Sequence, residues 1–193
     1  MRTSTSRLSS ASGGRFSRST FAVLRPNPGR DRGSLLNRFH FDRILNIMAV
    51  LIVLLGSWVI LRGIGALGVS LLATWRDSAR YALAIMFVFT ATAHFSKMKH
   101  DLSQMVPSFF PRRLWLVYIT GVLELLGAVG LLLPGFRSLA GVCLIALLCA
   151  MFMANVNAEL KGITLRGKPA TPLWQRTPMQ IFFIVLLWWS TRG

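Results

Sequence analysis

Apolar residues in this chain come in long blocks, without the spacing of three and four that marks a half-buried helix. Each block would form a helix that is apolar on all sides and therefore stable in lipid, so we predict membrane-spanning helices. Five such blocks follow one another, at residues 44–61, 81–96, 114–136, 138–158 and 178–189. The first would be about 27 Å long as a helix, close to the ~30 Å hydrocarbon core. The last block is short, and we expect its helix to begin near Leu173, with Pro178 marking a helix start.

The connectors add detail to this pattern. Residues 63–75 are apolar but short and glycine-rich, so they either continue the first helix or lie in the membrane interface. The polar connector 97–113 contains Phe109 and Phe110, which indicates an interfacial segment with aromatic anchors. Pro134 and Gly135 predict a tight turn, so the third and fourth blocks should form an antiparallel helical hairpin.

Composition and charge agree with a membrane protein. The hydrophobic fraction is 53% and the mean hydropathy is +0.55. A net charge of +16 would suggest nucleic acid in a soluble protein, but here the charges flank apolar blocks. We therefore assign them to membrane topology and to contacts with anionic lipid headgroups, and we expect no nucleic-acid partner. With the N-terminus inside, 17 Lys and Arg fall on the inner side and 5 on the outer side, which favours a cytoplasmic N-terminus.

Three regions follow from these patterns. Residues 1–43 are rich in Arg and Ser and poor in apolar residues, so we predict a disordered tail. Residues 44–75 form an extra hydrophobic span, and residues 78–191 form a four-helix membrane bundle. We predict a bacterial inner-membrane protein whose tail is a cytoplasmic arm; the alternative is an organellar membrane protein, because the tail also suits a transit peptide. Cys143 and Cys149 lie six residues apart on one helix and cannot pair with each other.

Glu124 lies in the middle of the third block. An ionised carboxylate at that depth costs at least ~2.5 kcal/mol, so Glu124 should be neutral, paired or facing an internal cavity. Gly121 and Ala128 share its helical face, which lets another helix approach closely. The competing interpretation is a structural hydrogen bond between helices.

His94 lies near the inner end of the second block, on one stripe with Phe87 and Thr90. A lone histidine of this kind is more often structural than functional. No second histidine at i+4 and no cysteine pair accompanies it, so we predict no metal site. Glu124 is central in its helix, whereas His94 is near a helix end. We therefore expect the distance between the two side chains to be several ångströms too long for both to act in one proton transfer.

Further polar groups lie at membrane depth or close to it, namely Tyr118, Asn155, Asn157 and Gln180. Each could serve only as an interhelical bond worth about 1 kcal/mol or less. Together with His94 and Glu124 they offer one polar group from each of four helices. Such groups can converge into a pocket for a quinone, lipid, sterol or proton.

Several sequence blocks, in a fixed order, resemble the pattern of a known family. They are Phe87 through Thr90 to His94-Phe95, Met105-Val106-Pro107, Tyr118 through Glu124 to Gly127, Asn155, and Arg176-Thr177-Pro178-Met179-Gln180. Over about residues 78–189 this pattern resembles the DoxX-like membrane proteins. The resemblance implies a four-helix membrane bundle, to which the first span and the tail are additions. His94, Glu124, Asn155, Arg176 and Gln180 occupy the places where the pattern is polar.

The DoxX-like name comes from a subunit of a thiosulfate:quinone oxidoreductase, and other members are linked to thiol or superoxide defence. The resemblance thus implies an accessory or quinone-binding component of a membrane redox or oxidative-stress system, with a membrane or redox protein as partner. We expect no catalytic activity of its own. No cysteine pair lies at a helix end, which disfavours thiol–disulfide chemistry.

Two other functions remain open at this point. One is a structural or assembly protein without a ligand, in which every polar group is interhelical. The other is a lipid isomerase-type enzyme that uses Glu124 as a general acid or base. Whether the polar groups share a cavity or already have partners separates these hypotheses.

Overall fold

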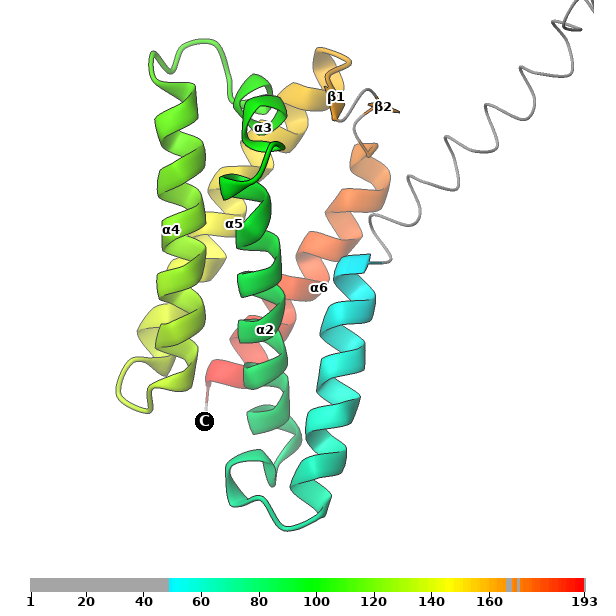
Figure 1. Ribbon diagram of the computed structural model, residues 1–193, viewed down its shortest axis with the longest axis vertical. Coiled ribbons are helices and arrows are strands. Elements are labelled where there is room, and N and C mark those ends of the chain that lie inside the picture. Colours follow the sequence, from blue (N-terminus) through cyan, green and yellow to red (C-terminus); the bar gives the residue numbers. More distant parts are fainter. Residues whose placement is uncertain (1–48, 166–167, 170, 193) are drawn as a thin grey trace, which may run out of the picture.

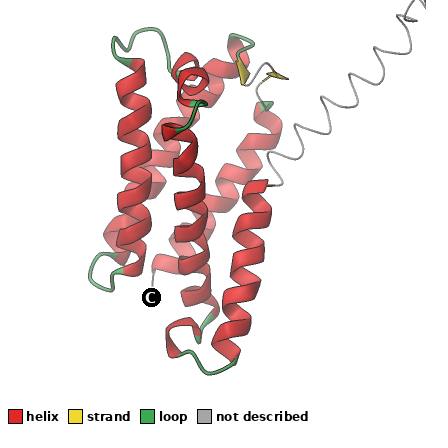
Figure 2. Cartoon of the chain, in the orientation of Figure 1, coloured by secondary structure: helices red, strands yellow, loops and turns green. Residues whose placement is uncertain are grey.

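The computed structural model describes residues 49–165, 168–169 and 171–192 as a bundle of helices (Figures 1 and 2). The predicted tail, residues 1–43, lies outside the described residues. The elements are a first helix Ala49–Ala66, η1 Ser70–Leu72, α2 Trp75–Phe95, α3 Lys99–Met105, α4 Arg113–Leu132, α5 Arg137–Leu160 and α6 Leu173–Thr191. The two-residue strands β1 Thr164–Leu165 and β2 Lys168–Pro169 pair antiparallel between α5 and α6.

Three helices of the described part are long and apolar enough to cross a membrane by length and composition. They are Ala49–Ala66, α4 and α5, with mean hydropathies of 2.1, 1.9 and 2.4. The described part is thus helical, and of the five predicted spans the first, third and fourth are matched by helices long and apolar enough to cross a membrane. The predicted turn at Pro134 and Gly135 joins α4 to α5, and the two helices pack side by side.

Helix boundaries depart from the apolar blocks in two places. α2 begins at Trp75, six residues before the predicted block, because Thr74 caps it by accepting a 3.0 Å hydrogen bond from the Asp77 backbone N–H. α6 begins at Leu173 as expected, but Pro178 lies inside this helix. The prediction that Pro178 marks a helix start is therefore wrong, and Pro172 occupies the N-cap position instead.

The undecided segment 63–75 continues the first helix for only its first few residues. The first helix continues to Ala66, after which Gly68 turns the chain with a φ of +106° that favours glycine. The 3₁₀ turn η1 then leads into α2.

Small residues set the distances between the helices. A Cβ added to Gly121 of α4 would lie 2.6 Å from the His94 Cβ of α2. Gly127 likewise faces Leu144 of α5, and Gly141 of α5 faces Thr191 of α6. Since any larger residue would collide, these glycines let neighbouring backbones approach closely. The first helix joins the same core through Leu54, which is fully buried.

Candidate functional site

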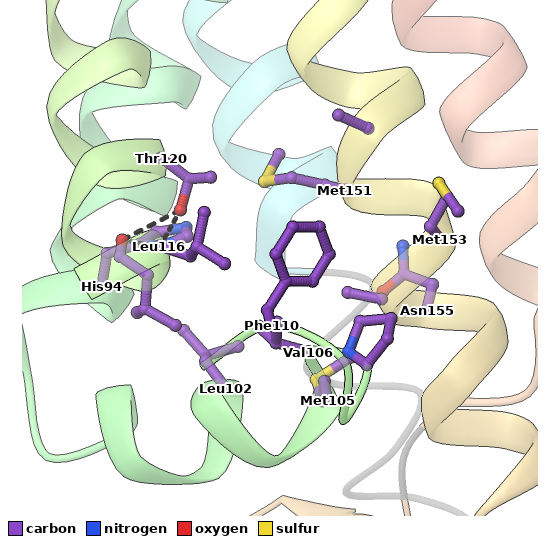
Figure 3. Close-up of a pocket in the computed structure, with 14 residues that line it drawn as sticks. His94, Leu102, Met105, Val106, Phe110, Leu116, Thr120, Met151, Met153 and Asn155 are labelled. Atoms are coloured by element: carbon purple, nitrogen blue, oxygen red, sulfur yellow. Dashed lines mark hydrogen bonds between the residues drawn. The ribbon is translucent and has the colours of Figure 1, made fainter. Parts of the chain in front are cut away.

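A cavity of about 270 Å³ lies at the end of the bundle where α3 sits (Figure 3). Ligand pockets usually measure about 300–1,000 Å³, so this cavity suits a small molecule or the head of a longer one. Its lining is mostly apolar, with Phe110 and Met151 among the larger side chains. The polar exceptions are His94 of α2, Thr120 of α4 and Asn155 of α5.

The packing of α4 against α5 explains where the cavity forms. Near the turn that joins them, Gly127 and Gly130 let α4 pack directly on Leu144 and Ala140 of α5. Toward the other end the two helices diverge in Figure 1. Val106, Pro107 and Phe110 of the connector between α3 and α4 line the cavity there. Asn157 of α5 fixes α3 over this end by donating a 2.7 Å hydrogen bond to the Met105 carbonyl.

The imidazole of His94 has a defined orientation. Its Nδ1 lies 2.9 Å from the Val117 carbonyl oxygen and 3.1 Å from Thr120 Oγ1. A carbonyl oxygen only accepts hydrogen bonds, so Nδ1 carries a proton. The Thr120 hydroxyl itself donates to the Val117 carbonyl at 2.9 Å, which lets its oxygen accept from Nδ1. In the neutral ring Nε2 is therefore the acceptor.

Glu124 faces that acceptor. Its Oε2 lies 3.7 Å from His94 Nε2 and 3.4 Å from Thr90 Oγ1, and the residue is only 3% exposed. A carboxylate and an unprotonated ring nitrogen would both be acceptors, so a proton on Glu124 or on His94 favours this contact. The pair can thus hold one proton inside the bundle.

The expectation that His94 and Glu124 lie too far apart is wrong. Side chains lean toward the N-terminus of their own helix, and α2 and α4 run antiparallel (Figure 1). His94, near the end of α2, therefore leans into the bundle, and Glu124 leans up to meet it. Gly121, one turn before Glu124, brings the two backbones close enough for contact.

The six candidate residues occupy three kinds of position. His94 and Asn155 line the cavity. Glu124 and Arg176 do not line it, but each contacts one of the lining residues. The Arg176 guanidinium donates to Asn155 Oδ1, and this joins α6 to α5.

Tyr118 and Gln180 form hydrogen bonds away from the cavity. The Tyr118 hydroxyl accepts a 2.7 Å hydrogen bond from Lys99 Nζ, close to α3. Gln180 of α6 donates to the Leu148 carbonyl of α5 at 2.8 Å. Neither residue lines the cavity, so the predicted convergence of polar groups holds for only part of the set.

Thr120 was missed by the sequence reasoning, although it orients His94. Its position four residues before Glu124, on the same helical face, is the signal that could have identified it. The apolar lining, including Phe110 and Met151, carries no comparable signal. Within the described residues no three His, Cys, Asp or Glu side chains gather in one place.

Comparison with known proteins places this region in a family. Residues 83–191, more than half of the chain, match the family described as a domain of unknown function, DUF8561. No curated protein and no solved structure gives a significant match. The matched segment begins within α2 and ends with α6, so it contains all six candidate residues and leaves out the first helix. The chain therefore belongs to the DUF8561 family.

Proposed function

We propose that α2, α4, α5 and α6 form a four-helix transmembrane bundle, with the first helix as an additional span. At 1.5 Å per residue, α2 is about 32 Å and α6 about 29 Å long, enough to cross the ~30 Å hydrocarbon core. Both helices run alongside the apolar helices α4 and α5 (Figure 1). The excess of Lys and Arg favours a cytoplasmic N-terminus and hence an inner end that carries α3 and the cavity. A bacterial inner membrane is the proposed location, with an organellar membrane as the alternative.

We further propose that the cavity binds a small lipid-soluble molecule, for which a quinone is the candidate. The observation that carries this proposal is an apolar cavity with His94 on one wall and the Glu124 carboxyl 3.7 Å from His94 Nε2, behind that wall. The function would then be that of an accessory component in a membrane redox or oxidative-stress system, in line with the resemblance to DoxX-like proteins. Electrons would come from a membrane or redox partner.

The rim of the cavity supports entry from the lipid phase. Met153 of α5 is 60% exposed and Phe110 is 38% exposed, although both line the cavity. The lining thus reaches the molecular surface beside α5, a helix apolar enough to cross the membrane. A molecule with an apolar chain could place its head inside while the chain stays in lipid.

The polar residues suit a carbonyl-bearing head. Arg176 binds Oδ1 of Asn155, which fixes the amide and presents its nitrogen as a donor for a carbonyl oxygen. On the other wall, His94 Nε2 lies 3.7 Å from the Glu124 carboxyl, and the two groups can hold a proton between them. Quinone reduction takes up protons as well as electrons, so a buried group that holds a proton is the chemistry such a head requires.

Native mass spectrometry with quinone extraction tests this function. A defined quinone should co-purify with the wild-type chain and be lost from the His94→Ala, Glu124→Gln double variant. The variant Gln180→Leu, whose side chain lies away from the cavity, is the matched control and should retain it. If no quinone accompanies the wild type and the double variant folds equally well, the polar residues serve only as bonds between helices.

A lipid isomerase-type enzyme is the second candidate. Such chemistry needs two proton-handling groups within reach of each other, and the 3.7 Å contact between His94 and Glu124 meets this condition. His94 would face the substrate, because Glu124 does not line the cavity. Double-bond migration in an added lipid, abolished by Glu124→Gln, would favour this function over quinone binding.

A further inference from the structure

Arginine and tryptophan side chains gather at the end of the bundle opposite the cavity. The end of the first helix, the start of α2, the α4–α5 turn and the end of α6 all lie there (Figure 1). Five arginines belong to these segments: Arg62, Arg76, Arg80, Arg137 and Arg192. The acidic residue in these segments is Asp77, which forms an ion pair with Arg80.

Three helices contribute to one aromatic cluster at this end. The Trp58 ring of the first helix lies 6.0 Å from the Trp75 ring, at 85° to it, and 6.3 Å from the Trp189 ring of α6. Trp58 Nε1 also donates to the Trp75 carbonyl at 3.1 Å. Because tryptophan favours the membrane–water interface, the cluster suits the headgroup region of the bilayer.

The arginines stack on this cluster. The guanidinium carbon of Arg62 lies 5.3 Å from the Trp75 ring centre, and that of Arg76 lies 5.6 Å from the Trp189 ring centre. Arg192 stacks on Trp188 at 4.4 Å. Stacking covers a flat face of the guanidinium and leaves N–H donors along its edge. One donor of Arg76 binds the Arg192 carbonyl at 3.1 Å, and its other N–H groups remain for a ligand. Those donors match the oxygens of a phosphate group.

Membrane topology does not explain these charges. In the proposed orientation this end is the outer one, where the positive-inside rule disfavours Lys and Arg. All five cations here are arginine, whereas the segments at the opposite end hold lysine as well as arginine, namely Lys97, Lys99 and Lys161 beside Arg112, Arg113 and Arg176. Arginine can bind phosphate through two parallel hydrogen bonds and lysine cannot, so the use of arginine alone at this end points to phosphate.

We propose that this arginine–tryptophan surface, formed by Arg62, Arg76 and Arg192 with Trp58, Trp75, Trp188 and Trp189, binds the headgroups of anionic phospholipids. A headgroup is the occupant because the surface lies at the ends of membrane-length helices, with Trp75 and Trp188 at least half exposed. The excess of arginine over acid complements a lipid that carries net negative charge. This inference does not depend on what the cavity binds.

Lipid selection from a defined mixture tests the surface. The full chain is placed in mixed micelles with equal amounts of phosphatidylglycerol and phosphatidylcholine, and native mass spectrometry counts the retained lipids. Wild type should prefer phosphatidylglycerol about tenfold, and the variant Arg62→Gln, Arg76→Gln, Arg192→Gln should fall below about twofold. The control Lys97→Gln, Arg112→Gln, Lys161→Gln removes equal charge from exposed positions at the other end and should keep the preference.

Equal losses in the two triple variants would overturn the proposal, because they would indicate a response to net charge alone. Retention of the full preference in the arginine variant would overturn it as well. If the arginine variant does not fold, Arg76→Gln alone replaces it, since this exposed side chain stacks on Trp189 and donates a 3.1 Å hydrogen bond to the Arg192 carbonyl at the chain surface. That single change should lower the preference at least twofold, and an unchanged preference would contradict the proposal.

Discussion

His94 Nε2 lies 3.7 Å from Glu124 Oε2, across an interface where Gly121 lets α2 and α4 approach closely. With His94 Nδ1 committed to the Val117 carbonyl, the pair can hold one proton but cannot be doubly unprotonated without two acceptors facing each other. The contact places this proton directly behind the wall of the cavity.

Replacement of Glu124 distinguishes a purely structural role of its carboxyl from a role in quinone binding. Glu124→Leu removes one interhelical polar contact, so we expect a loss of about 1 kcal/mol in stability together with loss of bound quinone. Glu124→Lys should be far more disruptive, because it buries an unpaired cation beside His94. Thermal unfolding in detergent measures both variants. If Glu124→Leu keeps its full quinone content, the carboxyl has only a structural role.

Gly121 should tolerate no side chain. An added Cβ would lie 2.6 Å from the His94 Cβ, so Gly121→Ala should destabilise the bundle by about 1–3 kcal/mol and disturb the His94–Glu124 contact. Gly135, in the α4–α5 turn, has open space around it, and Gly135→Ala is the control with an expected effect near zero. Similar unfolding temperatures for the two variants would contradict the close approach of α2 and α4.

Asn155 and Arg176 should behave as a coupled pair. Asn155→Leu leaves the half-buried Arg176 guanidinium without its amide acceptor, and we expect a cost of about 1–3 kcal/mol. The double variant Asn155→Leu, Arg176→Met removes the donor as well and should recover part of that loss. A double-mutant cycle of unfolding free energies checks this. Strictly additive effects would show that the two side chains do not depend on each other.

Introduced cysteines test the proposed topology. In a background of Cys143→Ser and Cys149→Ser, the variants Gly135→Cys and Arg192→Cys should react with an impermeant thiol reagent in intact cells. Gln104→Cys in α3 should react only after the membrane is permeabilised. Labelling of Gly135→Cys and Arg192→Cys from opposite sides would show that α6 does not cross. Labelling of Gln104→Cys in intact cells would reverse the orientation.

The hairpin of α4 and α5 was readable from the sequence because its signals are local. Apolar blocks long enough for a membrane, with Glu124 as their one acidic or basic residue, flank Pro134 and Gly135, and the turn lies there. The early start of α2 was not readable in the same way. Its first turns contain Asp77 and Arg80, which pair with each other, so a search for uncharged residues excludes them.

The burial of Glu124 beside small residues also followed from helical spacing, with Gly121 and Ala128 on its face. The contact between Glu124 and His94 could not be predicted in this way, because it depends on how α2 and α4 are staggered and on the direction in which their side chains lean. The cavity depends on contacts even further apart in the chain. Asn157 holds the Met105 carbonyl, 52 residues away, and no local pattern specifies that bond.

Filling the cavity tests the proposed function most directly. Ala150 lines the cavity and Ala146, one turn earlier on α5, does not, although both are exposed. The bound quinone per chain should be measured by extraction from purified wild type, Ala150→Trp and Ala146→Trp. If the cavity is the binding site, Ala150→Trp loses the quinone and Ala146→Trp retains the wild-type amount. Equal quinone content in all three proteins would contradict a binding site in this cavity.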